Sequence, residues 1–278
     1  MGQYFEYRQQ WNIVNYVQLF VFSVSLVLTM VLMGARKTQL TYYKGNTKVA
    51  FILVYEILQV AGAILGLVFM HLSKFNSTIY IICYVFDSAA IGFLIQVVYS
   101  GFEMIHAISG SDLKISAESR LLSTLLLAGM ATYTAGSSIL SNGNADTSYL
   151  LMKIGGFLFL AVTVLIFLSL VRLKTQSSNA SVLLFLTIVF VIVQIIYSLI
   201  VSFHKAMIST DQSTKFISKD VENNPKYLLY FGDYKYYLFM SLMMSICSTF
   251  TLVFSFFAMT NFEVPAKEDE LSMASQAV

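Results

Sequence analysis

The stretch 49–102, VAFILVYEILQVAGAILGLVFMHLSKFNSTIYIICYVFDSAAIGFLIQVVYSGF, decides the fold class of this chain. It contains two long apolar runs, which are separated by a short polar connection around Lys74 and Asn76. A helix needs about 20 mostly apolar residues to cross about 30 Å of hydrocarbon, and both runs reach that length. One carboxyl interrupts each run, Glu56 in the first and Asp87 in the second. The stretch therefore predicts a hairpin of two transmembrane helices.

The composition of the whole chain points in the same direction. Of its 278 residues, 57% are hydrophobic and 12% are charged, whereas about 25% are charged in a typical soluble domain. We therefore expect an integral membrane protein. A net charge of +2 leaves no basic surplus for nucleic-acid phosphates, which argues against nucleic-acid binding. The two cysteines, Cys83 and Cys247, give neither a metal-ligand spacing nor a disulfide framework.

Seven apolar runs are long enough to span a bilayer. We expect an all-α membrane protein, a seven-transmembrane-helix bundle within residues 1–262, followed by a disordered cytosolic tail at 263–278. The long connection at 204–235 runs into the aromatic stretch YLLYFGDYKYY, which either caps the outer mouth of the bundle or belongs to an unstructured tether. The predicted spans are about 13–34, 49–71, 78–102, 120–140, 149–171, 181–203 and 236–259.

Positive charges predict the side that each end of the chain faces. The connection after the first span carries Arg36, Lys37, Lys44 and Lys48, whereas only Arg8 precedes that span. Under the positive-inside rule the N-terminus lies outside, and an odd number of spans then places the C-terminus in the cytosol.

The same orientation gives a candidate modification site and a set of membranes. Asn76, followed by Ser77 and Thr78, forms a sequon that would face the lumen, so Asn76 is a candidate for glycosylation. We interpret the first span as a retained signal anchor. These features predict a multi-pass protein of the plasma membrane or of an endomembrane of the secretory pathway.

Ionisable residues at membrane depth are costly and usually face the interior of a helix bundle, so they are candidates for function. Glu56 and Asp87 meet this description on adjacent spans, and two close carboxyls would share a proton. Other polar residues lie at helical spacing from these carboxyls and so share their helix faces. Further polar residues lie at a similar depth in the sixth span. The alternative is that the amides only form interhelical hydrogen bonds. The predicted ligand-binding residues are Glu56, Gln59, Tyr84, Asp87, Gln194 and Tyr197; we predict no catalytic residue.

Residues that several known protein classes require are missing. No lysine occurs at 236–259, so the last span offers no place for a retinal Schiff base. Pro225 and Pro265 both lie outside the spans, so no span is broken by proline. The motifs HExxH and GxSxG and phosphate-binding loops are absent. The sequence therefore predicts neither a cofactor nor a metal site.

Four segments carry a resemblance to a known family: YRQQWNIVNYVQLFVFSVSLVL at 7–28, VYEILQVAGAILGLVF at 54–69, STIYIICYVFDSAAIGFLIQVVYSGF at 77–102 and IVQIIYSLIVSF at 192–203. In this pattern the chain resembles an uncharacterised fungal family of seven-span integral membrane proteins. It departs from the family at Gln194, where an arginine is expected, and at 244–247, where a carboxylate is expected. The resemblance implies a fungal source and a seven-helix fold, and it implies no catalytic function.

The sequence leaves three functions open. The leading hypothesis is a non-enzymatic, receptor-like sensor or carrier that binds a small lipophilic or cationic ligand within the bundle, surrounded by membrane lipids. The second is an intramembrane enzyme on lipid or isoprenoid substrates that uses the paired carboxyls as acids. The third is a membrane scaffold or assembly protein, in which the carboxyls are helix contacts. No protein partner is indicated.

Overall fold

The computed structural model describes residues 8–36, 45–72, 76–108, 115–139, 145–172, 178–204, 227, 229, 230 and 232–260. The described residues form helices and short turns, and they contain no strand. The predicted tail at 263–278 and most of the connection at 204–235 lie outside them. The long helices are α1 (Arg8–Ala35), α3 (Gly45–His71), α4 (Ser77–Ile108), α5 (Ile115–Ile139), α6 (Ala145–Arg172) and α7 (Ser178–Phe203). The last helical segment is continuous through α9 (Tyr234–Tyr237), the π-helical turn η3 (Leu238–Leu242) and α10 (Met243–Met259).

Each predicted span coincides with a helix, and the predicted and observed ends differ by at most six residues. Among the described residues, six helices are long and apolar enough to cross a membrane: α1, α3, α4, α6, α7 and the continuous α9–η3–α10 segment. α5 has 25 residues but is less apolar than the others, because Ser and Thr residues occur in both of its halves and its first half also contains Glu118 and Arg120. Length and composition therefore support six spans, and the seventh span stays a prediction.

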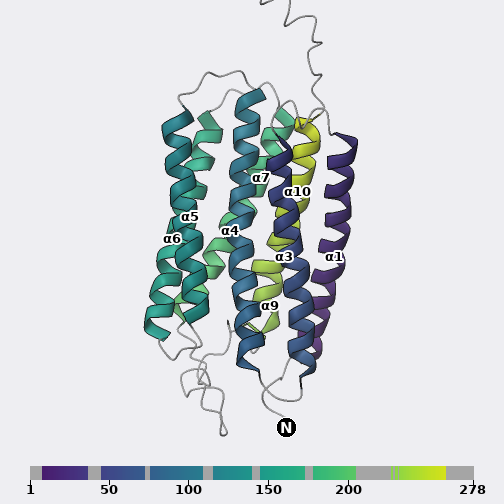
Figure 1. Ribbon diagram of the computed structural model, residues 1–278, viewed down its shortest axis with the longest axis vertical. Helices are drawn as coiled ribbons and strands as arrows, with labels where there is room; N and C mark the ends of the chain where they lie inside the picture. Colours follow the sequence, from purple (N-terminus) through teal and green to yellow (C-terminus); the bar gives the residue numbers. More distant parts are fainter. Residues whose placement is uncertain are drawn as a thin grey trace, which may run out of the picture.

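The long helices lie side by side along the long axis of the molecule, and successive helices run in opposite directions (Figure 1). Each helix packs against the next one in the chain, from α1 with α3 through to α7 with α10. α10 also contacts α1, which closes the bundle. α4 is central, because it contacts α3, α5, α6, α7 and α10. This arrangement places the start of α1 and the end of α10 at opposite ends of the bundle (Figure 1).

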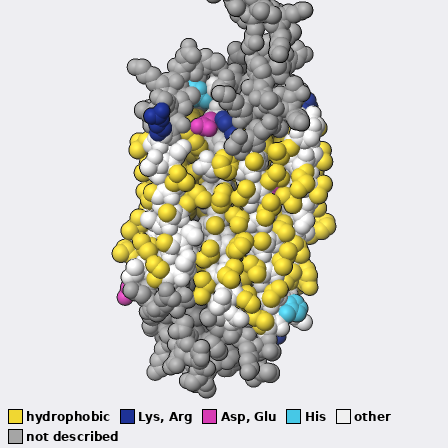
Figure 2. All heavy atoms as spheres, in the orientation of Figure 1, with side chains coloured by type: hydrophobic (Ala, Val, Ile, Leu, Met, Phe, Trp, Pro, Cys, Tyr) yellow, Lys and Arg dark blue, Asp and Glu magenta, His cyan; other side chains and the backbone are white. Residues whose placement is uncertain are grey.

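The polarity of the bundle is inverted relative to that of a soluble protein. Figure 2 shows hydrophobic side chains across the middle of the visible face, whereas the visible Lys and Arg side chains lie toward its two ends. On α1, Phe20 is 70% exposed and Ile13 is 62% exposed, whereas Asn15 and Gln18 are buried. An apolar surface of this extent is favourable against lipid and unfavourable in water. The fold is therefore that of a membrane-embedded, multi-pass helical protein.

Close contact between α5 and α6 depends on glycine. A Cβ added at Gly155 would lie 2.7 Å from the backbone nitrogen of Tyr133 and 2.8 Å from the carbonyl oxygen of Gly129. The two backbones therefore approach each other directly, as small residues permit between membrane helices. Ser148 Oγ also donates to the carbonyl oxygen of Gly136 at 2.6 Å. These contacts make α5 an integral member of the bundle.

Candidate functional site

Aromatic side chains close one end of the bundle, the end at which α1 begins. The Tyr230 ring centroid lies 5.3 Å from that of Trp11 and 5.5 Å from that of Phe69. Trp11 Nε1 donates to the carbonyl oxygen of Gly232 at 3.1 Å. Tyr230 has φ 65°, a left-handed conformation that bulky residues rarely adopt, so tertiary contacts hold it there. We name Trp11, Phe69, Tyr80, Tyr230 and Tyr237 the aromatic cap; it agrees with the predicted alternative in which this part of the chain caps the bundle mouth.

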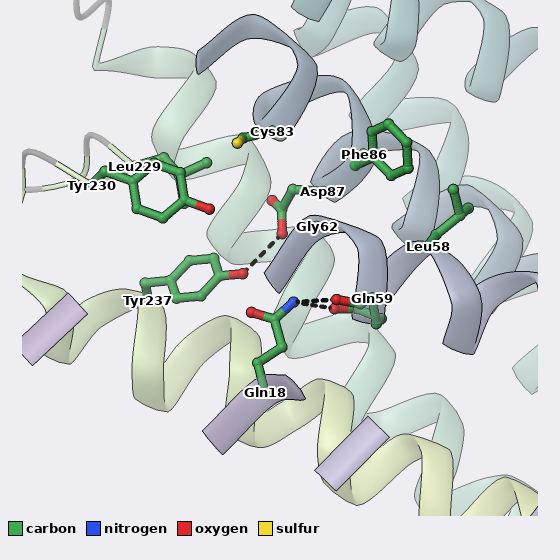
Figure 3. Close-up of a pocket in the computed structure, with 10 residues that line it drawn as sticks. All are labelled: Gln18, Leu58, Gln59, Gly62, Cys83, Phe86, Asp87, Leu229, Tyr230 and Tyr237. Atoms are coloured by element: carbon green, nitrogen blue, oxygen red, sulfur yellow. Dashed lines mark hydrogen bonds between the residues drawn. The ribbon is translucent and has the colours of Figure 1, made fainter. Parts of the chain in front are cut away.

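A small polar cavity lies next to Tyr230 and Tyr237 of the aromatic cap (Figure 3). The volume that the centre of a water molecule can occupy is about 10 Å³, so the cavity has room for about one water. Helices α1, α3 and α4 contribute to its wall, together with the segment that leads into the last span. The polar residues that line it are Gln18, Gln59, Cys83, Asp87, Tyr230 and Tyr237.

Asp87 is the acidic residue of the cavity. It lies ten residues after Ser77, or about 15 Å along α4, well inside the apolar part of the bundle. The hydroxyl of Tyr237 donates a hydrogen bond to Asp87 Oδ1 at 3.0 Å. No Lys, Arg or His is among the described residues that line the cavity. A carboxyl at this depth without a basic partner must carry a proton or bind a cation.

The amide of Gln18 presents its oxygen to the same space. Gln18 Nε2 donates to the backbone carbonyl oxygen of Gln59 at 3.3 Å and to Gln59 Oε1 at 2.7 Å. A backbone carbonyl can only accept a hydrogen bond, so the Gln18 nitrogen must face α3. Gln18 Oε1 therefore points away from α3 and toward Tyr237 (Figure 3).

Glu56 has a separate environment, against α1. Its Oε1 accepts hydrogen bonds from Ser25 Oγ at 2.5 Å and from Thr29 Oγ1 at 3.0 Å. Its Oε2 is buried and has no hydrogen-bond partner among the described residues. Glu56 is fully buried and is not among the residues that line the cavity.

The structure corrects the expectation that Glu56 and Asp87 form a pair. Gly62 on α3 is level with Phe86 on α4, because a Cβ added at Gly62 would lie 3.8 Å from Phe86 Cβ. Glu56 precedes Gly62 by six residues, which places it about 9 Å deeper along α3. The helical rise therefore separates the two carboxyls along the bundle, and each bonds to a different helical segment.

Comparisons with protein-family models, with curated proteins and with solved structures found no match. The resemblance to a fungal membrane family therefore stays a prediction. Among the described residues, no group of three or more His, Cys, Asp and Glu side chains is placed to hold a metal ion. The chemistry of the cavity comes from one carboxyl, two amides, two phenols and a thiol.

Of the other predicted ligand-binding residues, only Gln59 lines the cavity. Gln194 on α7 instead donates from Nε2 to Ser245 Oγ on α10 at 2.8 Å. Tyr84 on α4 and Tyr197 on α7 are buried in the core but do not line the cavity. Gln194 therefore forms an interhelical hydrogen bond, which was the alternative predicted for the amides.

Polar contacts nevertheless connect Gln194 with the cavity. Gln59 Nε2 donates to the Tyr55 hydroxyl at 3.4 Å. The Tyr55 hydroxyl also lies near the side chains of Ser245 and Thr249 of α10, and Ser245 is the partner of Gln194. A continuous set of polar side chains thus runs from the cavity across α3 and α10 to α7.

The predicted glycosylation site lies at the end of the bundle where α4 begins. Asn76 is exposed, and its Oδ1 accepts a hydrogen bond from the backbone nitrogen of Ile79 at 3.1 Å. This bond caps the first turn of α4. Glycosylation of Asn76 stays a prediction.

Gln18, Cys83, Tyr230 and Tyr237 were not predicted as site residues, although the sequence contains a signal for two of them. Cys83 precedes Asp87 by one helical turn and so shares its face. Gln18 belongs to a buried stripe on α1 with alternating spacings of three and four residues. No local pattern pairs Tyr237 with Asp87, because 150 residues separate them. The members of the α1 stripe are Asn15, Gln18, Phe22, Ser25 and Thr29.

Proposed function

We propose that this protein is a receptor-like sensor or carrier for a small cationic ligand, bound within the membrane bundle at Asp87. The observation that supports it is the cavity next to the aromatic cap, where a carboxyl, an amide oxygen and phenol oxygens meet without a basic side chain from the described residues. Acidic residues within membrane bundles usually face such a ligand or an ion pathway. A lipophilic ligand has weaker support, because sites for drug-sized molecules measure about 300–1,000 Å³.

The two alternatives have less support from the geometry. An intramembrane enzyme on lipid or isoprenoid substrates was inferred from an acid pair, whereas Glu56 bonds to Ser25 and Thr29 and Asp87 bonds to Tyr237. A scaffold needs no cavity, and the residues around Asp87 would then affect folding alone.

We also propose that all seven helices span the membrane, with the N-terminus outside and the C-terminus in the cytosol. The described Arg and Lys residues lie at both ends of the bundle. More of them lie at the end assigned to the cytosol, which agrees with the positive-inside rule. The aromatic cap then faces the exterior or the lumen, in the plasma membrane or an endomembrane of the secretory pathway. The cytosolic end carries Arg36, Lys48, Arg120 and Arg172, and the outer end carries Arg8, Lys153 and Lys235.

Cys83 supplies a test, because it lines the same cavity as Asp87. The chain has two cysteines, so a Cys247→Ser background leaves Cys83 as its single thiol. The rate of thiol modification is measured with a cationic reagent, trimethylammonium-ethyl methanethiosulfonate, and with neutral methyl methanethiosulfonate. Both reagents reach Cys83 only when the aromatic cap opens, and the Asp87 carboxylate should then favour the cation.

The expected result is that the rate advantage of the cationic reagent falls severalfold in Asp87→Asn and persists in the matched control Glu56→Gln. In sealed vesicles, a sensor exposes Cys83 to the cationic reagent from one side of the membrane, and a carrier exposes it from both. Equal rate ratios in the parent and in Asp87→Asn, or a Cys83 that no reagent modifies from either side, would contradict the proposal.

A further inference from the structure

We infer that the Asp87 cavity binds one dehydrated alkali-metal cation. The inference deepens the proposed function and rests on it, because it names the chemical class of the ligand at the same site. Three features carry it: the charge of the cavity, the kind of atom that faces it and its size.

The charge calls for a monovalent ion. Asp87 is the single acidic residue among the described residues that line the cavity, and no basic residue accompanies it there. One carboxylate and one monovalent cation together are neutral, which removes the cost of an isolated charge in a low-dielectric interior. A divalent ion would leave a net positive charge, and Ca²⁺ takes six to eight oxygen ligands, commonly from several carboxylates. Mg²⁺ keeps several waters, for which the cavity has no room.

The atoms that face the cavity are mainly oxygens, which hard cations prefer over nitrogen and sulfur. Asp87 Oδ1 is hydrogen-bonded to Tyr237, which leaves Oδ2 for a ligand. Gln18 Oε1 points into the space because Gln59 holds the Gln18 nitrogen, and Gln18 is only 5% exposed. The hydroxyl groups of Tyr230 and Tyr237 are directed toward Asp87 (Figure 3).

The size of the cavity selects a single-atom ion. Its free space holds about one water, so an organic ammonium does not fit while the aromatic cap is closed. Leu58, Gly62, Phe86 and Leu229 complete the wall and offer no polar side-chain atom to a ligand. A cation that enters must therefore exchange most of its water for the protein oxygens.

The cavity oxygens are held in place by neighbouring side chains. The Tyr237 ring centroid lies 5.3 Å from that of Trp11, and Tyr230 packs against Trp11 and Phe69. Gln59 fixes the amide of Gln18 by two hydrogen bonds. Ligand groups that are ordered before binding lose little entropy on binding, which favours a defined ion site over a loosely hydrated gap.

Trp11 gives a direct readout, because it is the one tryptophan of the chain and contacts both tyrosines of the cavity. The detergent-purified, full-length protein is titrated with NaCl, LiCl or KCl, with choline chloride keeping the ionic strength and chloride constant. Trp11 fluorescence and the unfolding temperature are recorded. At least one alkali cation should give a saturable change in both signals, and choline should give none.

Variants locate the site of the change. Asp87→Asn should raise the half-saturating cation concentration at least about tenfold, which corresponds to about 1.4 kcal/mol of binding free energy. Tyr237→Phe keeps the ring and removes one oxygen, so it should weaken binding severalfold. It also provides the test if Asp87→Asn does not fold. Glu56→Gln removes a buried carboxyl outside the cavity and should bind as the parent does.

Several outcomes would overturn the inference. No response to any alkali cation would mean that the cavity holds water only. A response that survives both Asp87→Asn and Tyr237→Phe, or one that Glu56→Gln abolishes, would place the ion elsewhere. If methylammonium protects Cys83 from modification in an Asp87-dependent manner while alkali cations have no effect, this inference fails and the proposed function stands. If neither kind of cation protects Cys83, both fail.

Discussion

Ser25 and Thr29 show how single residues make a buried carboxyl tolerable in this bundle. They lie one helical turn apart on α1, and both hydroxyls donate to Glu56 Oε1. The other oxygen, Oε2, has no partner among the described residues, so these two hydrogen bonds offset the cost of burying the carboxyl. Removing a partner from a buried polar group costs more free energy than the bond itself contributes, because the group left behind stays desolvated.

Replacing Ser25 should therefore destabilise the protein. Ser25→Ala is expected to lower the free energy of unfolding by about 1–2 kcal/mol. Ser23→Ala, two positions away on the same helix and partly exposed, should change it by less than about 0.5 kcal/mol. Denaturant unfolding in detergent, followed by circular dichroism, measures both. Equal effects of the two substitutions would show that the bond to Glu56 contributes nothing to stability.

Among the elements, α5 and α6 form the contact most sensitive to side-chain volume. Gly155→Ala would push a methyl group against the backbone of α5 at Tyr133 and Gly129, where no side-chain movement relieves the clash. We expect a loss of about 1–3 kcal/mol in unfolding free energy.

Gly34→Ala is the matched control, because an added Cβ there meets nothing within 4 Å. It should be neutral or should stabilise α1 by up to about 1 kcal/mol, since alanine favours a helix over glycine. Unfolding of both variants in detergent tests the pair. A Gly155→Ala protein as stable as Gly34→Ala would contradict the close approach of α5 and α6.

α3 leaves space for the aromatic cap at Gly66. A Cβ at this position would collide with the Tyr230 hydroxyl and with the side chain of Asn15. Gly66→Ala should therefore displace Tyr230, and in a Cys247→Ser background it should raise the rate at which Cys83 reacts with methyl methanethiosulfonate severalfold.

Gly34→Ala, near the far end of α1, is the control for this experiment. A Cβ there meets nothing within 4 Å, so the reactivity of Cys83 should stay near that of the parent. The cap would have no role in closing the cavity if Gly66→Ala left the rate of Cys83 modification unchanged.

The last helical segment also has an unusual local geometry next to the site. The π-helical turn η3 begins at Leu238, directly after the residue that bonds to Asp87. Such turns are rare and occur often at functional sites. Its position agrees with the proposal that the α9–η3–α10 segment takes part in ligand binding.

For the whole molecule, the number of spans decides on which sides the two ends of the chain lie. If α5 crosses the membrane together with the other helices, the N- and C-termini lie on opposite sides; with six spans they would share a side. The contacts of α5 with α4 and α6 favour the first case.

Glycosylation-acceptor tags test this prediction in a eukaryotic membrane system. A tag at the N-terminus should be modified and a tag at the C-terminus should not, because glycosylation occurs only on the luminal side. Protease protection of each tag in sealed vesicles provides an independent check. Modification of both tags, or of the C-terminal tag alone, would refute the proposed orientation.

Most of the fold could be predicted from the sequence, because hydrocarbon imposes a strong local rule. A helix satisfies all its backbone hydrogen bonds internally, so each long apolar run predicts a helix without reference to any other part of the chain. The helices at 8–35, 77–108 and 178–203 confirm this to within six residues of the predicted ends. α5 shows the limit of the rule, because its Ser, Thr, Glu and Arg residues lower its hydropathy while it stays helical.

The sequence by itself therefore determined that this chain is helical and membrane-embedded, and it identified Asp87 and Gln59 as residues of interest. Only the tertiary structure decided how those residues are grouped. It separated Glu56 from Asp87 along the helix axis, and it brought Tyr237 to Asp87 across 150 residues of sequence. The physical reason is that hydropathy and backbone hydrogen bonding act within one helix, whereas a site depends on the rotation and depth of several helices. Those are set by side-chain packing, such as that of Tyr230 against Trp11.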